Sequence, residues 1–148
     1  MKSRLLRLRE HVSDLHSALE ETSAARQLLE GEIGRSRYVE LHGQLYHIHG
    51  ALDDAYVTCS ELEPFWHPED VRSTILEQDL SNLGCESPPP ASNATGRLLD
   101  TVPGLHETWP GCVGTLYVVK GGRFGAEILI DPVSSALDIS GEPGSGVD

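Results

Sequence analysis

Basic residues are scarce in this chain. Lysine and arginine together number 11, against 23 aspartate and glutamate residues, and the formal net charge is −12. Such a chain repels phosphate groups, which argues against nucleic acid as a partner. No apolar run approaches the roughly 20 residues that a membrane-spanning helix needs, and the N-terminus lacks the apolar segment of a secretory signal. We therefore expect a soluble, cytoplasmic protein with no membrane partner.

Several common chemical motifs are also missing. The three cysteines, Cys59, Cys85 and Cys112, are widely spaced and no Cys-x-x-Cys pair occurs, so we interpret them as reduced thiols and not as a disulfide framework or a zinc site. The absence of Glu-x-x-His argues against a di-iron carboxylate bundle. The glycine patterns of phosphate and dinucleotide sites and the Gly-x-Ser-x-Gly elbow are absent as well.

Helical periodicity is the strongest pattern in the sequence. Near the N-terminus, apolar side chains recur at spacings of three and four and form one stripe, made of Leu5, Leu8, Val12, Leu15 and Leu19. Similar spacings predict the main helices near residues 3–20, 36–56, 68–83 and 112–137. A shorter helix is predicted over residues 24–29, with Ser23 as its N-cap. We therefore predict an all-α fold that forms a single domain over residues 1–148.

Proline and glycine mark the loops of this domain. Residues 84–95 contain three consecutive prolines and are interpreted as an internal loop. A short turn of helix is expected over residues 98–102. Residues 138–148 are rich in glycine, serine and proline and have no periodicity, so we interpret them as a flexible tail.

The glycine-rich part of the last predicted helix allows two interpretations. Gly121, Gly122 and Gly125 would each cost about 1 kcal/mol relative to alanine in a regular helix. They lie between two β-prone segments, residues 116–119 and 127–130, so the two adjacent glycines could instead turn a hairpin. If the segment is a helix, its glycines allow it to bend and allow a flat ligand to approach its backbone closely.

His16 is the histidine whose position most favours a ligand role. It follows Leu15 at the edge of the apolar stripe, so we expect it to be half turned towards the core with one ring nitrogen facing a pocket. Glu20 lies one helical turn further on and can accept the other imidazole N–H, which sets the tautomer of a ligating histidine. The alternatives are a core-edge histidine bonded to a backbone carbonyl and a solvated carboxylate.

Two segments of the chain, taken together, resemble one family. Residues 6–20, with the run Leu-His-x-x-Leu-Glu, resemble the first helix of bacterial biliverdin-producing heme oxygenases, which holds the proximal heme ligand. Residues 114–126 resemble the family's distal-helix motif, Gly-x-x-Tyr-Val-x-Glu-Gly-Ser-x-Leu-Gly-Gly, in the form carried by phytochrome-associated members. The middle helix, over residues 38–52, also fits the family's layout.

The resemblance implies a heme-oxygenase-like multi-helical bundle and a reaction. That reaction is the oxidative cleavage of heme to biliverdin, carbon monoxide and ferrous iron, with oxygen and an external reductant such as ferredoxin. Heme is then both cofactor and substrate, and a bilin-binding photoreceptor is implied as a downstream partner. The residues implied are the iron ligand His16, the heme-binding residues Glu20, Arg9 and Tyr117, and the catalytic glycines Gly121, Gly122 and Gly125.

The chain also departs from the family pattern. Lys120, Gly122, Phe124 and Ala126 stand where the motif has Glu, Ser, Leu and Gly. Gly122 offers no side chain to anchor the distal water that delivers protons in the family. Because family members continue with further helices, we expect the bundle to be incomplete at its C-terminal end, with weak heme binding and slow turnover. The alternatives are a non-catalytic heme-binding protein and a cofactor-free helical interaction module.

Overall fold

The computed structural model describes residues 4–139, and this part of the chain contains helices and no strand, as predicted. The elements in chain order are α1 (Arg4–Glu20), α2 (Ser23–Leu29), α3 (Arg35–Val57), the 3-10 helices η1 (Ser60–Leu62) and η2 (Pro68–Asp70), α4 (Ser73–Asn82), α5 (Asn93–Leu99), α6 (Val102–His106) and α7 (Trp109–Leu137). None of the described helices is both long enough and apolar enough to cross a bilayer.

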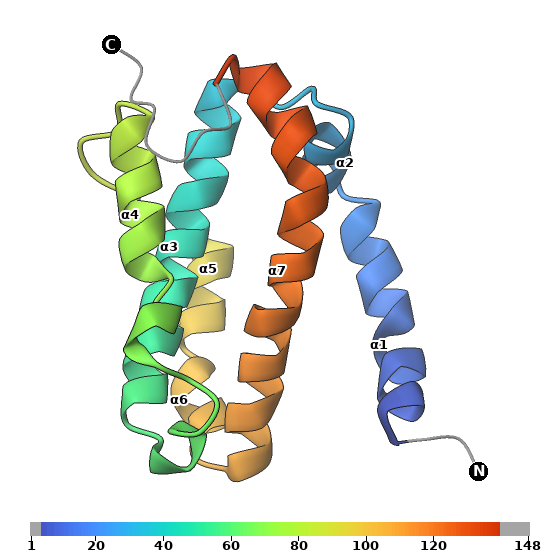
Figure 1. Cartoon of the computed structure of the whole chain (residues 1–148), viewed down its shortest axis with the longest axis vertical. Coiled ribbons are helices and arrows are strands. Elements are labelled where there is room, and N and C mark those ends of the chain that lie inside the picture. The colour runs from blue at the N-terminus through green and yellow to red at the C-terminus, as the bar shows by residue number, and fades with distance from the viewer. Residues whose placement is uncertain (1–3, 140–148) are drawn as a thin grey trace.

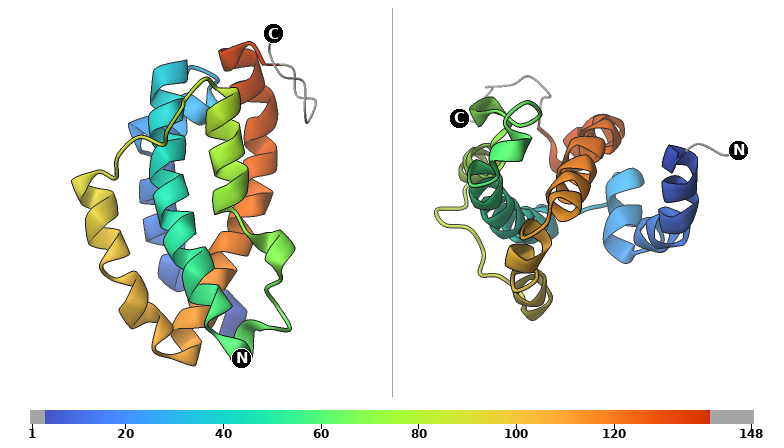
Figure 2. Two further views of the ribbon diagram at one scale, coloured as in Figure 1. Left: turned by 90° about the vertical axis from the view of Figure 1, so that its left-hand side faces the viewer. Right: turned by 90° about the horizontal axis from the view of Figure 1, so that it is seen from below.

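The two longest helices, α3 and α7, run in opposite directions through the middle of the molecule (Figure 1). α4 packs on α3, and α5 and α6 also contact α3 (Figure 2). α2 packs on α7, and α1 lies beyond α2 at the edge of the molecule (Figures 1 and 2). As a result, α7 has α3 on one side and the α1–α2 segment on the other.

Two apolar clusters hold this arrangement together. The larger joins α3, η1, α6 and α7, and its buried members are Leu52, Tyr56, Leu62, Val102, Cys112 and Leu116. The smaller joins the connection between α2 and α3 to the end of α7 through Ile33, Val133 and Leu137. Burial of these side chains supplies most of the driving force for packing the helices.

α7 is one continuous helix, so the hairpin that the sequence left open does not form. Thr108 caps its start, because the hydroxyl accepts a hydrogen bond from the Gly111 amide. The glycines of residues 121–125 lie inside the helix. Buried side chains before and after them, such as Leu116 and Val133, pack against neighbouring elements and offset the intrinsic cost of the glycines.

Several predicted boundaries were wrong. Ser23 does not cap α2, because the Thr22 hydroxyl makes the capping hydrogen bond and Ser23 already lies in the helix. The loop predicted over residues 84–95 ends early, because Ser92 caps α5 there. The short turn expected over residues 98–102 instead spans the end of α5 and the start of α6.

The helix predicted over residues 68–83 is divided in two. Residues 68–70 form η2, and α4 begins only at Ser73. The buried carboxylate of Asp53, on α3, accepts hydrogen bonds from the Arg72 and Ser73 amides at 3.0 and 2.9 Å. These are amides that the start of a helix leaves without a partner, so a tertiary contact decides where α4 begins.

The tail predicted over residues 138–148 falls largely outside the described residues. Asp138 adopts a positive φ of 54° and ends α7. Ile139 packs against the smaller apolar cluster, and residues 140–148 lie outside the part of the chain that the structure describes.

Candidate functional site

His16 and Glu20 form a pair on α1. The His16 Nδ1 atom lies 3.3 Å from the Glu20 Oε1 atom, and the two side chains are 70% and 58% exposed. A carboxylate beside Nδ1 favours the tautomer with its hydrogen on that atom and leaves the lone pair of Nε2 for a metal. The pairing expected from the four-residue spacing is therefore present, and the ring bonds a carboxylate, not a backbone carbonyl.

The expected burial of His16 against the core is wrong. In the described chain α1 contacts only α2, so its apolar stripe does not reach the core. The stripe residues are between 40% and 74% exposed, namely Leu8, Val12, Leu15 and Leu19. Arg9 is also exposed and lies two turns before His16 on the same side of the helix. α1 thus presents an unpartnered apolar stripe with an imidazole at its edge.

α7 also has an exposed side, which carries Tyr117, Gly121 and Gly125. Spacings of four keep these residues on one side of the helix. Tyr117 is 49% exposed, and Ile128 on the same side is 68% exposed. The space where a Cβ on either glycine would lie is open among the described side chains, with no packed atom of theirs within 4 Å. A flat ligand can therefore lie directly against this backbone.

Gly122 belongs to a different side of α7. It lines a cavity of about 660 Å³ between α3, α4 and α7, and neither Gly121 nor Gly125 lines that cavity. Consecutive residues of an α-helix point about 100° apart, which explains the separation. The three glycines that the sequence grouped as one catalytic set are therefore divided between two faces.

Two histidines of α3, His42 and His49, also line this cavity and were missed as site residues in the sequence. Their Nδ1 atoms are buried and have no hydrogen-bond partner among the described residues. The signal in the sequence was their spacing of seven, which is two helical turns and places both on one side of α3. A search for pairs of ligands four residues apart does not detect them.

Burial lowers the pKa of both histidines. For His42 the nearby Asp79 carboxylate opposes the effect of burial on the pKa. For His49 the Asp53 carboxylate opposes it, whereas the Arg72 guanidinium lowers the pKa further. Both rings are therefore held neutral at a pH where an exposed imidazole is already partly protonated.

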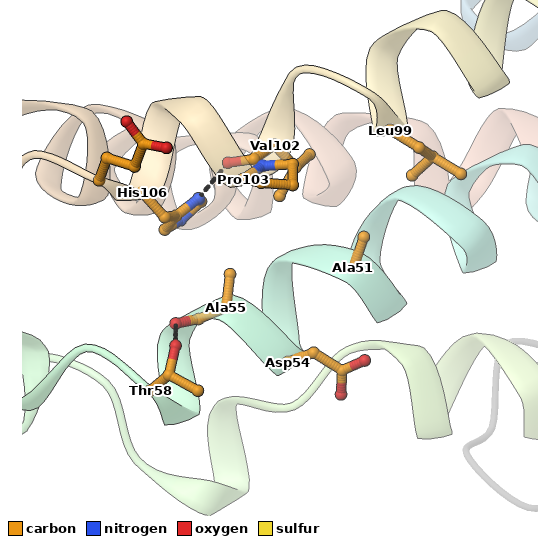
Figure 3. A pocket seen from close by; sticks show the side chains of 9 residues that line it. Ala51, Asp54, Ala55, Thr58, Leu99, Val102, Pro103 and His106 are labelled. Atoms are coloured by element: carbon orange, nitrogen blue, oxygen red, sulfur yellow. Dashed lines mark hydrogen bonds between the residues drawn. The ribbon is translucent and has the colours of Figure 1, made fainter.

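A second, shallower pocket of about 500 Å³ lies between α3 and the α5–α6 segment (Figure 3). His106 lines it beside Ala55 and Pro103. The His106 Nδ1 atom lies 3.0 Å from the Val102 carbonyl oxygen, and Nε2 lies 3.1 Å from Thr115 Oγ1. Because both ring nitrogens bond the protein, His106 holds α6 and α7 together and is not available as a ligand.

The donor set restricts the kind of metal that His16 can hold. Among the described residues, no group of three or more His, Cys, Asp and Glu side chains is placed to bind a metal ion. A single imidazole can still hold a metal whose other coordination positions are filled by the ligand that carries it. Iron in a porphyrin would meet this requirement, because the macrocycle would supply most of the ligands and His16 would supply one more.

Comparison with known families agrees with this chemistry. The family model for heme oxygenase matches residues 3–146, which is nearly the whole chain. The chain belongs to the heme oxygenase family. No curated protein sequence matches it.

Solved heme oxygenase structures share the fold. The chain is similar to heme oxygenase-1 from the cyanobacterium Synechocystis in complex with heme, with 25% identity and a TM-score of 0.81, over 95% of this chain and 66% of that chain. It is similar to the heme oxygenase from Leptospira interrogans, with 24% identity and a TM-score of 0.81, over 94% and 71% of the two chains. The chain thus spans about two thirds of the length of the cyanobacterial protein.

One departure from the heme oxygenase motif has a structural explanation. Lys120 stands where the motif has a glutamate, and its Nζ atom lies 2.8 Å from Asp70 Oδ2. The Asp70 side chain is only 15% exposed, so this ion pair is better shielded from water than a surface pair. This ion pair links η2 to α7, so the positive charge of Lys120 stabilises the packing of these two elements.

Proposed function

We propose that this chain binds heme through His16 and cleaves it oxidatively to biliverdin, carbon monoxide and ferrous iron. The observation that carries the proposal is the His16–Glu20 pair, which leaves one imidazole nitrogen exposed beside an unpartnered apolar stripe. Membership of the heme oxygenase family and the likeness to a heme-bound cyanobacterial structure support it.

The residues present fit a heme. A porphyrin is flat and largely apolar, and its two propionates carry negative charge. The stripe on α1 and the open side of α7 offer apolar surface and bare backbone, and burying such surface contributes about 25 cal/mol per Å². Arg9 supplies a cation for a propionate in a chain whose net charge is −12.

Each of these residues has a role in holding the substrate. Heme supplies the iron chemistry and is itself the substrate, and the protein supplies binding, orientation and exclusion of water. His16 binds through Nε2, while Glu20 orients the ring and keeps the hydrogen on Nδ1. Between Tyr117 and Ile128, Gly121 and Gly125 leave two adjacent turns of this side of α7 without side chains, so that a flat substrate can lie close to the backbone there.

Partners follow from the chemistry of the reaction. Oxidative cleavage consumes electrons, so we propose an external donor such as ferredoxin. A bilin-binding photoreceptor is the proposed recipient of the product. We propose that residues 1–148 act as one domain in the cytoplasm.

Gly122 favours a second candidate function, a heme-binding protein without turnover. The resembling motif has serine at this position, and glycine has no hydroxyl with which to hold water on the distal side. In this case His16 would bind heme in the same way, and the bound heme would persist in the presence of a reductant.

Hemin titration followed by absorbance tests the proposal. We expect a Soret band that is typical of a heme bound by one imidazole. His16→Ala should abolish or strongly weaken this band, because α1 then offers no ligand at that position. His11→Ala removes another exposed histidine from the same helix and should leave the spectrum nearly unchanged. An unaltered spectrum in the His16 variant would rule out the assignment.

Addition of ascorbate or a ferredoxin system to the complex separates the two candidates. Loss of the Soret band with growth of a red biliverdin band supports the oxygenase, and we expect this conversion to be slow. A Soret band that persists under reducing conditions supports the heme-binding protein instead.

A further inference from the structure

Two of the three cysteines lie at the same end of the molecule. Cys59 follows the last turn of α3 and precedes η1, and Cys112 lies in the first turn of α7. Because α3 and α7 run in opposite directions, the end of one is beside the start of the other (Figure 1). Cys112 is a buried member of the larger apolar cluster, and Cys59 packs against that cluster. The fold therefore brings together two thiols that are distant in the sequence.

The two thiols also interact directly. Burial raises the pKa of the Cys59 thiol to about 11, and the Cys112 thiol raises it further through a side-chain hydrogen bond and through charge repulsion. The Cys59 Sγ atom lies 3.6 Å from Glu61 Oε2, and this carboxylate also disfavours the thiolate. The Cys112 Sγ atom lies 3.5 Å from the His106 carbonyl oxygen, to which it donates. All three cysteines are free thiols in this structure.

The position of Cys112 is fixed by the packing of α6 against α7. A Cβ on the preceding residue, Gly111, would collide with the backbone of Leu105 in α6, so only glycine allows so close an approach. The His106 Nε2 atom lies 3.1 Å from Thr115 Oγ1 and links the same two helices. Cys112 is thus held beside Cys59 by the backbone around it and not by its thiol alone.

The surroundings of the pair favour an uncharged product. Cys59 is half-buried, so a small reagent can reach it, whereas Cys112 is only 1% exposed. Apolar packing disfavours a thiolate but accepts a disulfide, which carries no charge. The described residues offer no group of three or more metal ligands, so the pair is not part of a larger metal site. Little thiolate is present at neutral pH, which makes the reduced pair slow to react.

We propose that Cys59 and Cys112 are a modification site, at which a small disulfide such as oxidised glutathione converts the two thiols into a reversible internal disulfide. The Cys59 thiolate attacks one sulfur of the reagent and displaces one molecule of reduced glutathione. The Cys112 thiolate then attacks the Cys59 sulfur and displaces the second molecule. The protein thiols lose two electrons and two protons, and the reagent takes up both. The proposal does not depend on the proposed function.

The disulfide would link the end of α3 to the start of α7. It closes a loop over residues 59–112, which contains α4, α5 and α6. A link of this kind restricts the unfolded chain. We therefore expect the equilibrium constant for unfolding in urea to fall by about 30-fold or more after oxidation, and to return when dithiothreitol reduces the link.

The test uses the full chain carrying Cys85→Ser, in which only the two thiols of interest remain. After incubation with oxidised glutathione at a mildly alkaline pH, the thiols are counted under denaturing conditions and the intact mass is measured. We expect both thiols to be lost, the mass to fall by two hydrogen atoms, and no glutathione to be retained. A peptide map of the oxidised unmodified chain should contain Cys59 and Cys112 in one linked pair of peptides.

Two further variants separate the roles of the thiols. Adding Cys112→Ala should leave glutathione attached to Cys59, because no second thiol displaces it. Adding Cys59→Ser should leave Cys112 unmodified in the folded chain, since it is buried, and should remove the stabilisation by oxidation. The substituted side chain in this second variant is half-buried, and serine is close to cysteine in size.

Retention of both thiols, or of glutathione on Cys59 while Cys112 is present, would overturn the inference. A disulfide between two molecules, seen as a doubled mass, would overturn it as well. An internal disulfide that leaves the unfolding constant unchanged or raises it would contradict the proposed link between α3 and α7. None of these results depends on whether the chain binds hemin, so the proposed function is tested separately.

Discussion

At the scale of the residue, the structure divides the histidines by environment. His16 is exposed and paired with a carboxylate, so it is free to meet a ligand. His47 and His106 bond the carbonyl oxygens of Pro89 and Val102 and hold loops and helices in place. His42 and His49 are buried with an unpartnered Nδ1 atom each. The same side chain therefore serves as candidate ligand, structural bond or buried polar group according to its surroundings.

The buried pair leads to a prediction about acid stability. Burial lowers the pKa of His42 and His49 below the ordinary value of 6.5. As the pH falls below about 6.5, the unfolded chain takes up protons that the folded chain does not, so the free energy of unfolding must decrease. We expect the decrease between about pH 6.5 and pH 5 to be smaller in His42→Phe and smallest in His42→Phe/His49→Phe.

Urea denaturation at a series of pH values measures this slope. The comparison is between slopes, so a constant loss of stability from the substitutions does not disturb it. A slope that is identical in the unmodified chain and in the double variant would show that these rings do not carry the effect.

At the scale of the element, α3 determines where its neighbours begin. Asp53 accepts hydrogen bonds from the first amides of α4. Gln44 does the same for the start of α5, because its Oε1 atom accepts from the Ser92 amide at 2.8 Å and from Thr95 Oγ1 at 2.7 Å. Pro89 packs against Gly43, where a Cβ would lie 2.6 Å from the proline ring. One helix therefore fixes two helix starts and the loop between them.

Removal of the Asp53 carboxylate should show how much this arrangement contributes. We expect Asp53→Ala to lower the free energy of unfolding by about 1–3 kcal/mol, because two amides at the start of α4 lose their acceptor in a buried place. Asp54→Ala is the matched control, since this neighbouring aspartate is exposed. Urea denaturation measures both, and equal losses in the two variants would contradict the capping role.

At the scale of the whole molecule, the N-terminal helix is attached to a single neighbouring element in the described chain. α1 touches only α2 within the described chain, and its described side chains are exposed. α2 is in turn attached to α7, where Gly31 lies against the backbone of Pro132. The proposed heme would therefore join α1 to the rest of the molecule, since α1 and α7 both present unpartnered apolar surface.

Hydrogen exchange tests this coupling. Without heme, amides of α1 should exchange much faster than those of α3 and α7, because few tertiary contacts oppose its local opening. With hemin at about 100 times its Kd, exchange in α1 should slow by about 100-fold, as mass action requires. His16→Ala should lose this protection. Slow exchange in α1 before hemin is added would show that the helix is already held by the protein.

The sequence by itself determined the features that depend on local helix geometry. Spacings of three and four predicted α1 and α3, and the four-residue spacing placed Glu20 beside His16, because 3.6 residues per turn fix which side chains are neighbours. The order of the two segments, residues 6–20 and 114–126, was enough to indicate the family.

Only the tertiary structure decided which of these faces are covered. Propensity alone left residues 116–130 open to a hairpin, and burial of Leu116 and its neighbours against α3 made the segment a helix. The stripe of α1 was expected to be buried and is exposed, while Gly122 and His49 line one cavity from helices that are distant in the sequence. A periodic pattern indicates that one face of a helix is apolar. Packing over the whole chain determines which element, if any, covers that face.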